Sequence, residues 1–548
     1  MKHINFTLFF TILMSMVVVQ SFAYDIAIEN EDGVLIYYSY RDIPGELEVT
    51  TRSSTTLRNL WGYEGVRELK IPSEVTYKNR TWKVTSIAED TFHPYSAYNG
   101  GYELILESIW IPKSINNIQI RAFEDCKTLK KVVVEDIGAW CNAAKSSNPL
   151  TIAKHIYNYN NEEITDLNIP ESVKSIDDKE FMDCLSLKTV SMSNSLKSIG
   201  RRAFYGCVNI ANVVIGDGVA SIGSYAFYGC DKLKTVSIGS SVSAIGSYAF
   251  QNCNNLTRVI IKDVTSWCGI NFEYAQYGTP FVKEDTYSCF PSNYIHLFCN
   301  DSEISDLVIP DEVSVVSPYA FHGVAGLKSV QFSDNVTRIG RDAFSGCPDL
   351  EKVIIGNGLK SISEFRGCRK LSEIQFGNNV TSIGESAFEF CGFVSLSLPN
   401  GITDISAGAF QFCTKLEEIR LPNSLKTIGY EAFYGCDQVL SVYSPIRTPF
   451  SIIYNYQNKK INPFSRETLY NATLYIPKGT KERYQNTDGW NEFLWMEEDV
   501  TSGVDKIINK IGIEISRYNI DGKIEQTPYG GINIIKTNEG IVRKILVK

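Results

Sequence analysis

The chain has 548 residues, of which 21% are charged and 12% aromatic, and its formal net charge is −9 at pH 7. The aromatic content excludes a wholly disordered chain. The acidic balance and the lack of a basic run argue against a nucleic-acid groove, so we expect no nucleic-acid partner. At this length the chain can hold several globular domains or one elongated body.

Residues 1–23 have the order of features found in a secretory signal peptide. A basic residue precedes an apolar run from Phe6 to Val19, and positions 21 and 23 hold the small residues expected before a cleavage site. The run is shorter than the roughly 20 residues that span a bilayer, which argues against the alternative of an uncleaved anchor. We therefore predict a secreted or outer cell-surface protein with no transmembrane segment after signal cleavage.

Residues 24–90 alternate between apolar and polar side chains in the manner of hairpin strands. We predict that they form an N-terminal β cap and the first coil of a repeat array. Such a cap covers the apolar edge that a first coil would otherwise expose.

A motif of 23 residues recurs between residues 91 and 442, and its copies predict a solenoid. One full copy reads AFYGCDKLKTVSIGSSVSAIGSY, from Ala226 to Tyr248. Stacked copies align equal positions into ladders at the strand spacing of about 4.8 Å. The phenylalanines that mark the copies and form the predicted structural ladder are Phe92, Phe123, Phe181, Phe204, Phe227, Phe250, Phe321, Phe344, Phe365, Phe388, Phe410 and Phe433.

Each copy contains two short strands and a tight connection. Val236 and Ile238 form a period-2 pair, which predicts a strand with both side chains inward. Gly246, after a second short strand, is expected at a corner that needs a positive φ. The residues before Phe227 are too few for a free helix, so we expect one helical or 3₁₀ turn that drives Ala226 and Phe227 inward. The predicted fold is an α/β solenoid of short parallel strands, turns and single helical turns, with a small β module at the C-terminus.

Ten of the fourteen cysteines recur at one position of the motif, where Val324 stands in one copy. In a secreted chain this pattern first indicates disulfides. Equivalent side chains in stacked coils point in parallel rather than toward each other, however, which favours buried and unpaired thiols. The ten are Cys126, Cys184, Cys207, Cys230, Cys253, Cys347, Cys368, Cys391, Cys413 and Cys436.

Two insertions, at about residues 136–163 and 263–303, resemble each other in sequence. Each opens with a short segment that contains a tryptophan, Trp140 or Trp267, and each ends in EIxDLxIP. We expect the two tryptophans to fill the core where the coil widens; the alternative is a platform for a ligand.

The second insertion also holds Cys289 and Cys299, which are better candidates for a disulfide than the ladder cysteines. The sequence leaves the redox state of this pair open. Zinc spacing is absent, since the chain has no CxxC pair and few histidines, so we predict no metal site.

The pattern L..V.I...V..IG..AF.GC, over roughly residues 66–442, resembles the leucine-rich repeats of BspA-type surface antigens from Bacteroidetes. The resemblance implies a leucine-rich repeat solenoid of about 14 or 15 coils, about 70 Å long at the strand spacing. It also implies an adhesin whose partners are host extracellular matrix or plasma proteins, such as fibronectin and fibrinogen, or other bacteria. The alternative is a surface protein that binds glycans for a polysaccharide-uptake system.

Residues 443–500 resemble the closing segment found after such arrays, so we expect a C-terminal capping segment there. Residues 501–548 alternate like strands around Asp-Gly and Glu-Gly pairs that suit tight turns. This β tail resembles the C-terminal modules that Bacteroidetes use for sorting across the outer membrane. In the alternative, the tail simply docks on the last coil.

No catalytic motif is present, since the sequence lacks GxSxG, HExxH, P-loop and GxGxxG patterns. None of the four histidines after the signal segment stands beside a plausible nucleophile. Carboxylates are plentiful, so a glycosidase pair stays open, yet Asp and Glu mostly occupy turn positions that local hydrogen bonding explains. We predict a protein that is not an enzyme and needs no cofactor.

Binding is the function that remains. Positions beside the buried Ala-Phe pair point outward and differ between copies, and tyrosines crowd them in three consecutive coils. Exposed tyrosines contribute a large contact area at low rotamer cost; in the alternative, the rings pack on one another and shield the coil edge. The candidate ligand-binding residues are Tyr205, Tyr225, Tyr228 and Tyr248. The outward strand positions form a second, shallow candidate face: Ser191, Val214, Ser237, Ile260, Gln331, Ile354, Gln375, Ser397 and Arg420.

Overall fold

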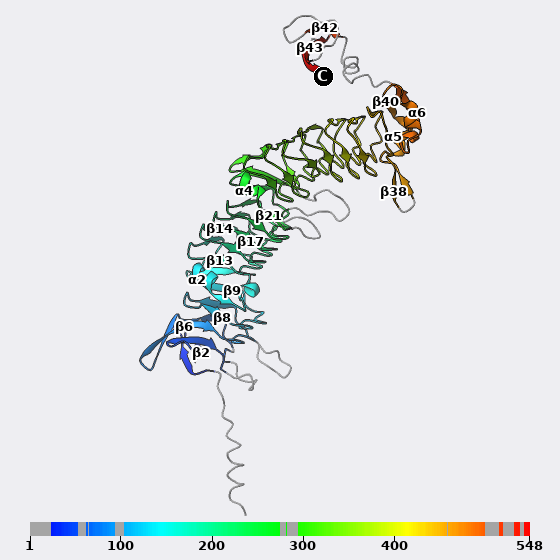
Figure 1. Ribbon diagram of the computed structural model, residues 1–548. Coiled ribbons are helices and arrows are strands. Elements are labelled where there is room, and N and C mark those ends of the chain that lie inside the picture. Colours follow the sequence, from blue (N-terminus) through cyan, green and yellow to red (C-terminus); the bar gives the residue numbers. More distant parts are fainter. Residues whose placement is uncertain are drawn as a thin grey trace, which may run out of the picture. The chain divides into compact units, whose positions relative to one another are not determined.

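The computed structural model describes residues 24–52, 62–63, 65–93, 104–273, 281, 294–456 and 459–498, and three strands of the tail. The chain divides into two compact units, one up to Leu350 and one from Glu351 onward. Together the units hold about 16 turns of β-solenoid, slightly more than the 14 or 15 expected. The predicted fold class, a solenoid of short parallel strands with little helix, is confirmed (Figure 1). The predicted signal peptide, residues 1–23, lies outside the described residues.

The first unit begins with a small sheet in which antiparallel hairpins lead into the coils. Strand β6 joins its two parts, because it pairs with β5 in a hairpin and runs parallel to both β3 and β8. Buried residues such as Ile36, Leu47 and Val84 form its apolar side. The strands are β1 (Ile26–Glu29), β2 (Leu35–Tyr40), β3 (Glu46–Thr50), β5 (Glu74–Tyr77), β6 (Arg80–Ile87), β8 (Asn117–Ile118) and β10 (Ala144–Lys145).

The coils of the first unit contribute strands to two rows of parallel sheet. The longer strands are β4 (Glu68–Lys70), β7 (Ser108–Ile111), β9 (Lys131–Val134), β11 (Ile156–Asn158), β12 (Asp166–Ile169), β14 (Thr189–Met192), β16 (Asn212–Val214), β18 (Thr235–Ser237), β20 (Arg258–Ile261), β22 (Ile295–Cys299), β24 (Asp306–Val308) and β27 (Ser329–Gln331). The two-residue strands of the other row are β13 (Ser175–Ile176), β15 (Ser198–Ile199), β17 (Ser221–Ile222), β19 (Ala244–Ile245), β21 (Asn271–Phe272), β25 (Val315–Val316) and β28 (Arg338–Ile339).

The insertions of the first unit add short elements to this pattern. Their helices are α2 (Ile137–Asn142), α3 (Leu150–Ala153) and α4 (Val264–Cys268). Strand β22 pairs with β20 and also with the short strands β23 (Ser302–Glu303) and β26 (Val324–Ala325).

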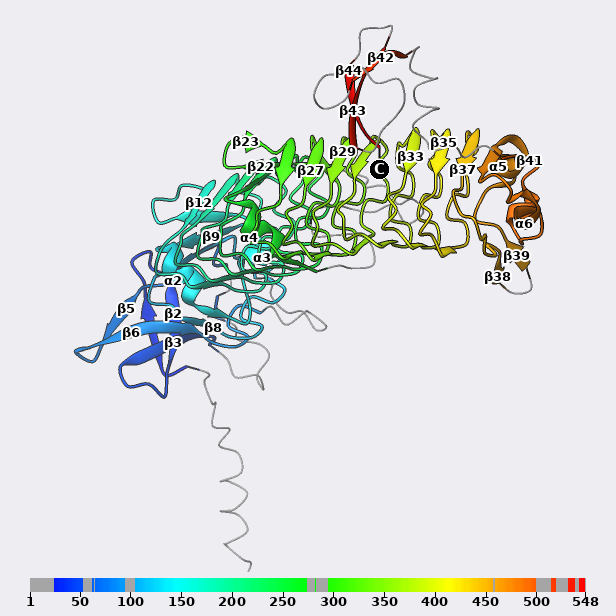
Figure 2. The same cartoon turned by 45° about the horizontal axis from the view of Figure 1, so that its top comes forward.

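The second unit repeats the two rows, and Figure 2 shows β33, β35 and β37 side by side along one of them. Its first row contains β29 (Lys352–Ile354), β31 (Glu373–Gln375), β33 (Ser395–Ser397), β35 (Glu418–Arg420), β37 (Ser441–Tyr443), β40 (Thr473–Ile476) and β41 (Trp495–Glu498). The other row contains β30 (Ser361–Ile362), β32 (Ser382–Ile383), β34 (Asp404–Ile405) and β36 (Thr427–Ile428).

The last part of the second unit departs from the repeat. It contains the hairpin of β38 (Tyr454–Tyr456) and β39 (Lys459–Ile461), the helices α5 (Arg466–Asn471) and α6 (Lys481–Gln485), and the 3₁₀ helix η1 (Trp490–Glu492). The tail forms an antiparallel sheet of β42 (Glu514–Tyr518), β43 (Gly531–Thr537) and β44 (Val542–Val547).

A ladder of phenylalanine rings occupies the core of the first unit. Phe181, Phe204, Phe227 and Phe250 stack in succession with centroid distances of 5.2, 5.0 and 5.1 Å, and their planes differ by at most 9°. The second insertion continues the series with Phe281, 4.8 Å from Phe250, although no motif marks this residue. Further along the unit, another pair of ladder rings, Phe321 and Phe344, lies 4.9 Å apart.

The second unit has the same ladder. The ring of Phe388 lies 5.8 Å from Phe365 and 5.4 Å from Phe410, which in turn lies 5.4 Å from Phe433. Phe464, from the segment after the last motif, closes the series at 5.1 Å from Phe433. All of these rings are buried, so each ring that has two neighbours loses its solvent contact on both faces.

The connection before each ladder phenylalanine is a run of turns, and the expected helical or 3₁₀ turn is not found in the described coils. The N–H groups of Ala226 and Tyr228 close turns within their own coil, at 3.2 Å each. The N–H of Phe227 between them donates to the carbonyl of Ala249 in the next coil, at 2.7 Å. This alternation replaces the helix because it links neighbouring coils, whereas a helix would use its N–H groups internally.

Gly246 does not have the positive φ that the sequence suggested. A Cβ at this position would lie 2.4 Å from the backbone nitrogen of Ser224, so the close approach of the preceding coil requires glycine. Left-handed residues occur instead two positions before and two after the ladder phenylalanine, as at Tyr225 (φ 61°) and Gly229 (φ 72°).

The ten ladder cysteines are free thiols, as predicted. The Sγ of Cys230 donates to the carbonyl oxygen of Phe204 in the preceding coil at 3.3 Å, and burial raises the pKa of this thiol, so it stays protonated as a donor. Two ladder positions, Cys184 and Val324, do not show this contact with the carbonyl of the preceding coil, and each belongs to the first motif copy after an insertion. Cys184 shares a hydrogen bond with Ser186 Oγ instead. The same Sγ-to-carbonyl contact occurs at Cys126, Cys207, Cys253, Cys347, Cys391, Cys413 and Cys436.

One partner of the predicted disulfide lies within the described residues. Cys289 lies outside the described residues, while Cys299 ends strand β22 and is partly exposed. Their pairing therefore stays a prediction.

Candidate functional site

The four candidate tyrosines form one cluster, which we call the tyrosine stack. Tyr205 and Tyr228 each follow a ladder phenylalanine by one residue, and their rings stack at 5.1 Å and 7°. Tyr225 and Tyr248 each precede a ladder phenylalanine by two residues, and their centroids lie 5.0 Å apart. Tyr225 also packs against Tyr228 at 5.5 Å, which joins the two pairs.

The backbone does not select aromatic residues at these positions. Tyr225 and Tyr248 have φ values of 61° and 60°, in the left-handed region that costs a residue with a side chain roughly 1–2 kcal/mol. The equivalent position in the second unit holds glycine in one copy, Gly408, and small Ser386 in another. The rings of Tyr225 and Tyr248 are therefore present despite the backbone geometry, which a smaller residue would serve as well.

A cation and a hydrogen bond fix the orientation of the tyrosine stack. The guanidinium of Arg202 lies 5.7 Å from the ring centroid of Tyr205 and 5.4 Å from that of Tyr225. Asn252 Nδ2 donates to the hydroxyl of Tyr228 at 2.6 Å. Burial, followed by the neighbouring phenols, raises the pKa of Tyr228, so its hydroxyl stays neutral.

All four tyrosines are half-buried. Part of each ring thus packs on its neighbours, as the alternative of a shielded coil edge requires, and part remains open for contact. Their role in ligand binding stays a prediction.

The outward strand positions also lie in register. Ser191, Val214, Ser237 and Ile260 occupy matching positions of four neighbouring strands, and Val214 is 49% exposed. This row is shallow and mixed in polarity. The next strand adds an aromatic ring, Phe298, to the same row.

The sequence analysis missed the aromatic residues at the ends of these rows. The Arg258 guanidinium lies 3.8 Å from the ring centroid of Phe298, and the Arg420 guanidinium lies 4.0 Å from that of Tyr443. Tyr443 stacks on Tyr475 at 4.6 Å. The alternation of inward and outward residues in the strands beside an insertion, or at the end of the array, could have identified Phe298 and Tyr443 from the sequence.

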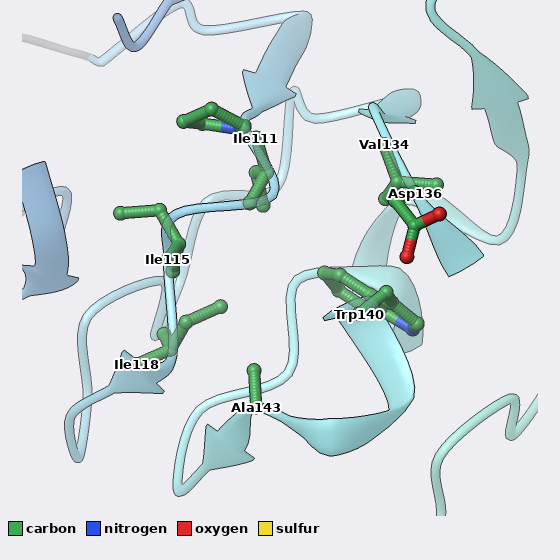
Figure 3. A pocket seen from close by; sticks show the side chains of 8 residues that line it. Ile111, Ile115, Ile118, Val134, Asp136, Trp140 and Ala143 are labelled. Carbon is green, nitrogen blue, oxygen red and sulfur yellow. The ribbon is translucent and has the colours of Figure 1, made fainter. Parts of the chain in front are cut away.

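The two insertion tryptophans fill the core, as expected. Each follows an aspartate that caps its helix, since the Asp136 side chain accepts from Ala139 N and the Asp263 side chain from Ser266 N. Figure 3 shows Trp140 facing Ile115 and Ile118 across a cavity of about 10 Å³, which has room for one water molecule at most. The Trp267 indole donates to the carbonyl of Ala320 at 2.8 Å. Both rings are buried, so neither is a platform for a ligand.

A buried ion pair, which the sequence analysis did not find, accompanies Trp140. Lys145 Nζ lies 3.2 Å from Glu180 Oε1, and the two side chains are only 3% and 1% exposed. The same ammonium donates to the carbonyl oxygens of Trp140 and Ala143 and lies 5.0 Å from the Trp140 ring centroid. Burial raises the pKa of Glu180 to about 8, and the charge of Lys145 opposes this rise.

The second insertion replaces this ion pair with apolar residues. Phe272 stands where the first insertion has Lys145, five residues after the tryptophan, and its ring lies 5.0 Å from that of Trp267. Ala320 stands where the first has Glu180, directly before a ladder phenylalanine. The same two positions thus hold a buried Lys–Glu pair beside one tryptophan and apolar side chains beside the other.

A groove lies beside the start of the array, and we call it the N-terminal groove. Its volume is about 390 Å³. The β1–β2 turn, the segment between β4 and β5, and residues that follow β9 and β11 form its walls. The polar and aromatic lining includes Asn30, Glu31, Asp32, Lys70, Ser73, Glu74, Glu135 and Tyr159.

In the part of the chain that the structure describes, no group of three or more His, Cys, Asp or Glu side chains could hold a metal ion. Two exposed histidines each pair with a glutamate: His155 with Glu163 at 2.6 Å and His296 with Glu303 at 2.5 Å. None of the described helices is long and apolar enough to cross a membrane.

The comparison with protein families gives one match. The family described as "BspA type Leucine rich repeat region" matches in six copies, over residues 94–141, 151–277, 294–391 and 363–462, which amount to more than half of the chain. No curated protein matches the chain.

Several solved structures resemble the chain. A leucine-rich repeat protein from Bacteroides ovatus is 29% identical, with a TM-score of 0.47, over 77% of this chain and 95% of that protein. A leucine-rich cell surface protein from Faecalibacterium prausnitzii is 22% identical, with a TM-score of 0.36, over 76% and 94%. The pneumococcal vaccine antigen PcpA is 16% identical, with a TM-score of 0.35, over 87% and 100%.

Proposed function

Because this chain belongs to the BspA-type leucine-rich repeat family, we propose that it is an extracellular adhesin, secreted or held on the outer cell surface. The family indicates a protein-interaction role. More specifically, we propose that the solenoid surface binds host matrix or plasma proteins, or other bacteria. We propose no catalytic activity and no cofactor.

The tyrosine stack is the observation that carries this proposal. Its rings gather on one edge, are half-exposed, and include two that a left-handed backbone does not favour. Large rigid rings of this kind supply contact area at low entropic cost. Four of the corresponding positions in other copies carry small or charged residues, namely Asp342, Ser345, Ser386 and Glu389, while Tyr319 and Tyr434 occupy two others. The repeat itself therefore does not require aromatic residues there.

The proposed domain organisation follows from the same account. Residues 1–23 direct export, 24–90 cap the array, and 91–442 form the leucine-rich repeat solenoid that binds the partner. Residues 443–500 close the array, and 501–548 form a β tail that serves as a sorting module.

Binding of purified protein tests the class of ligand. Residues 24–548 are applied to immobilised fibronectin and fibrinogen and, in parallel, to a glycan array. Saturable binding to either matrix protein supports the adhesin. Binding to glycans alone, lost when the tyrosine stack is changed, would favour the alternative of a polysaccharide-uptake protein. Protease treatment of intact cells tests the location, because a surface-displayed solenoid is digested without lysis.

A further inference from the structure

The N-terminal groove has the dimensions of a small-ligand site. Its volume of about 390 Å³ falls in the range of 300–1,000 Å³ that ligand clefts occupy. It is formed by segments from the cap and from the first coils, which meet beside strands β4 and β5. The outward strand rows, in contrast, are shallow.

The groove is held in shape by contacts between its own walls. Asn30 Nδ2 donates to the Lys70 carbonyl at 3.0 Å, and Asn30 Oδ1 accepts from the backbone of Val34 at 2.9 Å. The Lys70 ammonium lies 3.1 Å from the carboxylate of Asp32. Lys113 fixes Glu135 through its backbone N–H at 3.0 Å and its ammonium at 2.9 Å. Asn30, Asp32, Lys70 and Glu135 are therefore in place without a ligand, which lowers the entropic cost of binding.

The charges of the groove suit a neutral ligand with hydroxyl groups. Lys70 offsets Asp32, and Lys113 offsets Glu135. Glu31 and Glu74 also face the groove, and no salt bridge involves either within the described residues. The groove thus offers carboxylate acceptors together with an ammonium donor, a combination that matches hydroxyl groups, which both donate and accept. An anion would be repelled by the carboxylates. Because Lys70 already pairs with Asp32, Glu31 and Glu74 leave the groove net negative, so a cation is the competing class of ligand.

An aromatic ring completes the groove. Tyr159 lines it with 38% of its surface exposed, and its ring packs edge-on against Trp110 at 5.4 Å and 71°. The Trp110 ring is less accessible, because the ammonium groups of Lys70 and Lys131 lie 5.1 and 5.9 Å from its centroid. Tyr159 therefore offers the ring on which an apolar C–H face can rest.

We propose that the N-terminal groove binds a neutral sugar residue of an oligosaccharide. Tyr159 stacks on the C–H face of the sugar ring, while Lys70, Glu31 and Glu74 bind its hydroxyl groups. The site is separate from the tyrosine stack in sequence and lining, so it does not depend on the adhesin proposal.

The test begins with an array of neutral and charged glycans, probed with residues 24–548. The glycan that binds most strongly is then titrated by calorimetry, beside a hexalysine peptide, against the wild type and the variants Tyr159→Ala and Glu74→Gln. We expect Tyr159→Ala to weaken binding roughly tenfold, the value of one aromatic contact. We expect Glu74→Gln to weaken it several-fold. Tyr454→Ala, at an exposed tyrosine of the second unit, is the matched control and should bind as the wild type does.

Glu74 is exposed, so Glu74→Gln tests the site even if Tyr159→Ala fails to fold. The proposal is overturned if no neutral glycan binds, or if hexalysine or an acidic glycan binds more tightly than any neutral one. It is also overturned if binding survives both variants, or if it is lost only when the tyrosine stack is changed.

Discussion

Phe227 has ladder neighbours on both faces, at 5.0 and 5.1 Å, and its side chain has no exposed surface. Its backbone N–H also binds the next coil. A residue of this kind contributes to two interfaces between coils at once. The outward residue of a strand, such as Val214, is exposed and is not part of the core.

Phe227→Ala should lower the free energy of unfolding by about 3–5 kcal/mol, because it leaves a cavity that its neighbours cannot fill. Urea unfolding followed by circular dichroism measures the change. Val214→Ala is the control and should shift stability by less than about 0.5 kcal/mol. An unchanged unfolding curve for Phe227→Ala would mean that the ladder does not hold the coils together.

The Lys145–Glu180 pair allows a comparison within one protein, since the second insertion has Phe272 and Ala320 at these positions. Glu180→Ala should destabilise the protein by about 3–5 kcal/mol, because it leaves the buried Lys145 ammonium without its partner. Lys145→Phe should also destabilise it, because it leaves the buried Glu180 carboxyl without a partner. The double variant should restore wild-type stability or exceed it. A double variant as unstable as the sum of the single ones would show that the insertions are not interchangeable.

The same pair predicts a dependence of stability on pH. The pKa of Glu180 rises from 4.5 to about 8 in the folded chain, so between these values the folded state holds a proton that the unfolded state has released. Stability should therefore fall as pH rises through this window, by at most about 1.4 kcal/mol per pH unit from this group. The difference in melting temperature between wild type and Glu180→Gln, measured from pH 4 to 9, reports this term. A difference that does not change with pH would contradict it.

At the scale of the coil, two sets of contacts run from one copy to the next. Alternate backbone N–H groups bind the following coil, as at Phe227, and ladder thiols bind the preceding one, as at Cys230. Neither set needs a covalent link. The cysteines are therefore small buried groups that supply one weak donor each.

A mild reductant should change the melting temperature little, because the ten ladder thiols are unpaired and the predicted Cys289–Cys299 bond lies outside the ladder. Iodoacetamide should not label them in the native protein, since the thiolate is the reactive form and burial raises the pKa of Cys207, Cys230 and Cys413 far above neutral pH. All ten should react after unfolding in guanidinium, and peptide mass spectrometry counts them. A large loss of stability on reduction, or labelling of these cysteines in the native state, would contradict the account.

The sequence predicted the positions that recur in every coil. It did not predict the hydrogen bonds between coils or the contacts made by residues outside the motif. The period placed Phe227, Val236 and the ladder thiols correctly, because equal residues at equal spacing must stack. It could not distinguish a helical turn from alternating turns, since that choice depends on hydrogen bonds to the next coil. Lys145 and Glu180 are 35 positions apart and match no motif, so only the folded chain brings them together.

The candidate sites were predictable to different degrees. The tyrosine stack was found because its members recur at fixed offsets from the ladder phenylalanines. The N-terminal groove was not found, because Tyr159 and Glu31 belong to an insertion and to the cap, outside the period. Residues that the repeat does not dictate are the ones that can differ in function between members of one fold.

At the scale of the whole molecule, the family membership and the tyrosine stack point to the same proposal. A repeat solenoid offers an extended surface on which each coil presents its own outward residues. A few large aromatic residues commonly carry most of the energy of an interface. The central claim is therefore that this chain is an adhesin whose partner contacts the tyrosine stack.

The most direct test replaces Tyr225, Tyr228 and Tyr248 together with serine. Another copy already has serine, Ser386, at the position equivalent to Tyr225 and Tyr248. Binding to the matrix protein that the wild type recognises is measured by surface plasmon resonance, with the melting temperature as the check on folding. A control variant carries the same change at three exposed tyrosines of the second unit: Tyr434, Tyr454 and Tyr470. We predict that the stack variant folds and loses at least about 2 kcal/mol of binding free energy, or roughly thirtyfold in affinity, while the control binds normally. Full binding by a folded stack variant would contradict the claim, and so would unfolding of that variant, which would assign the rings to packing.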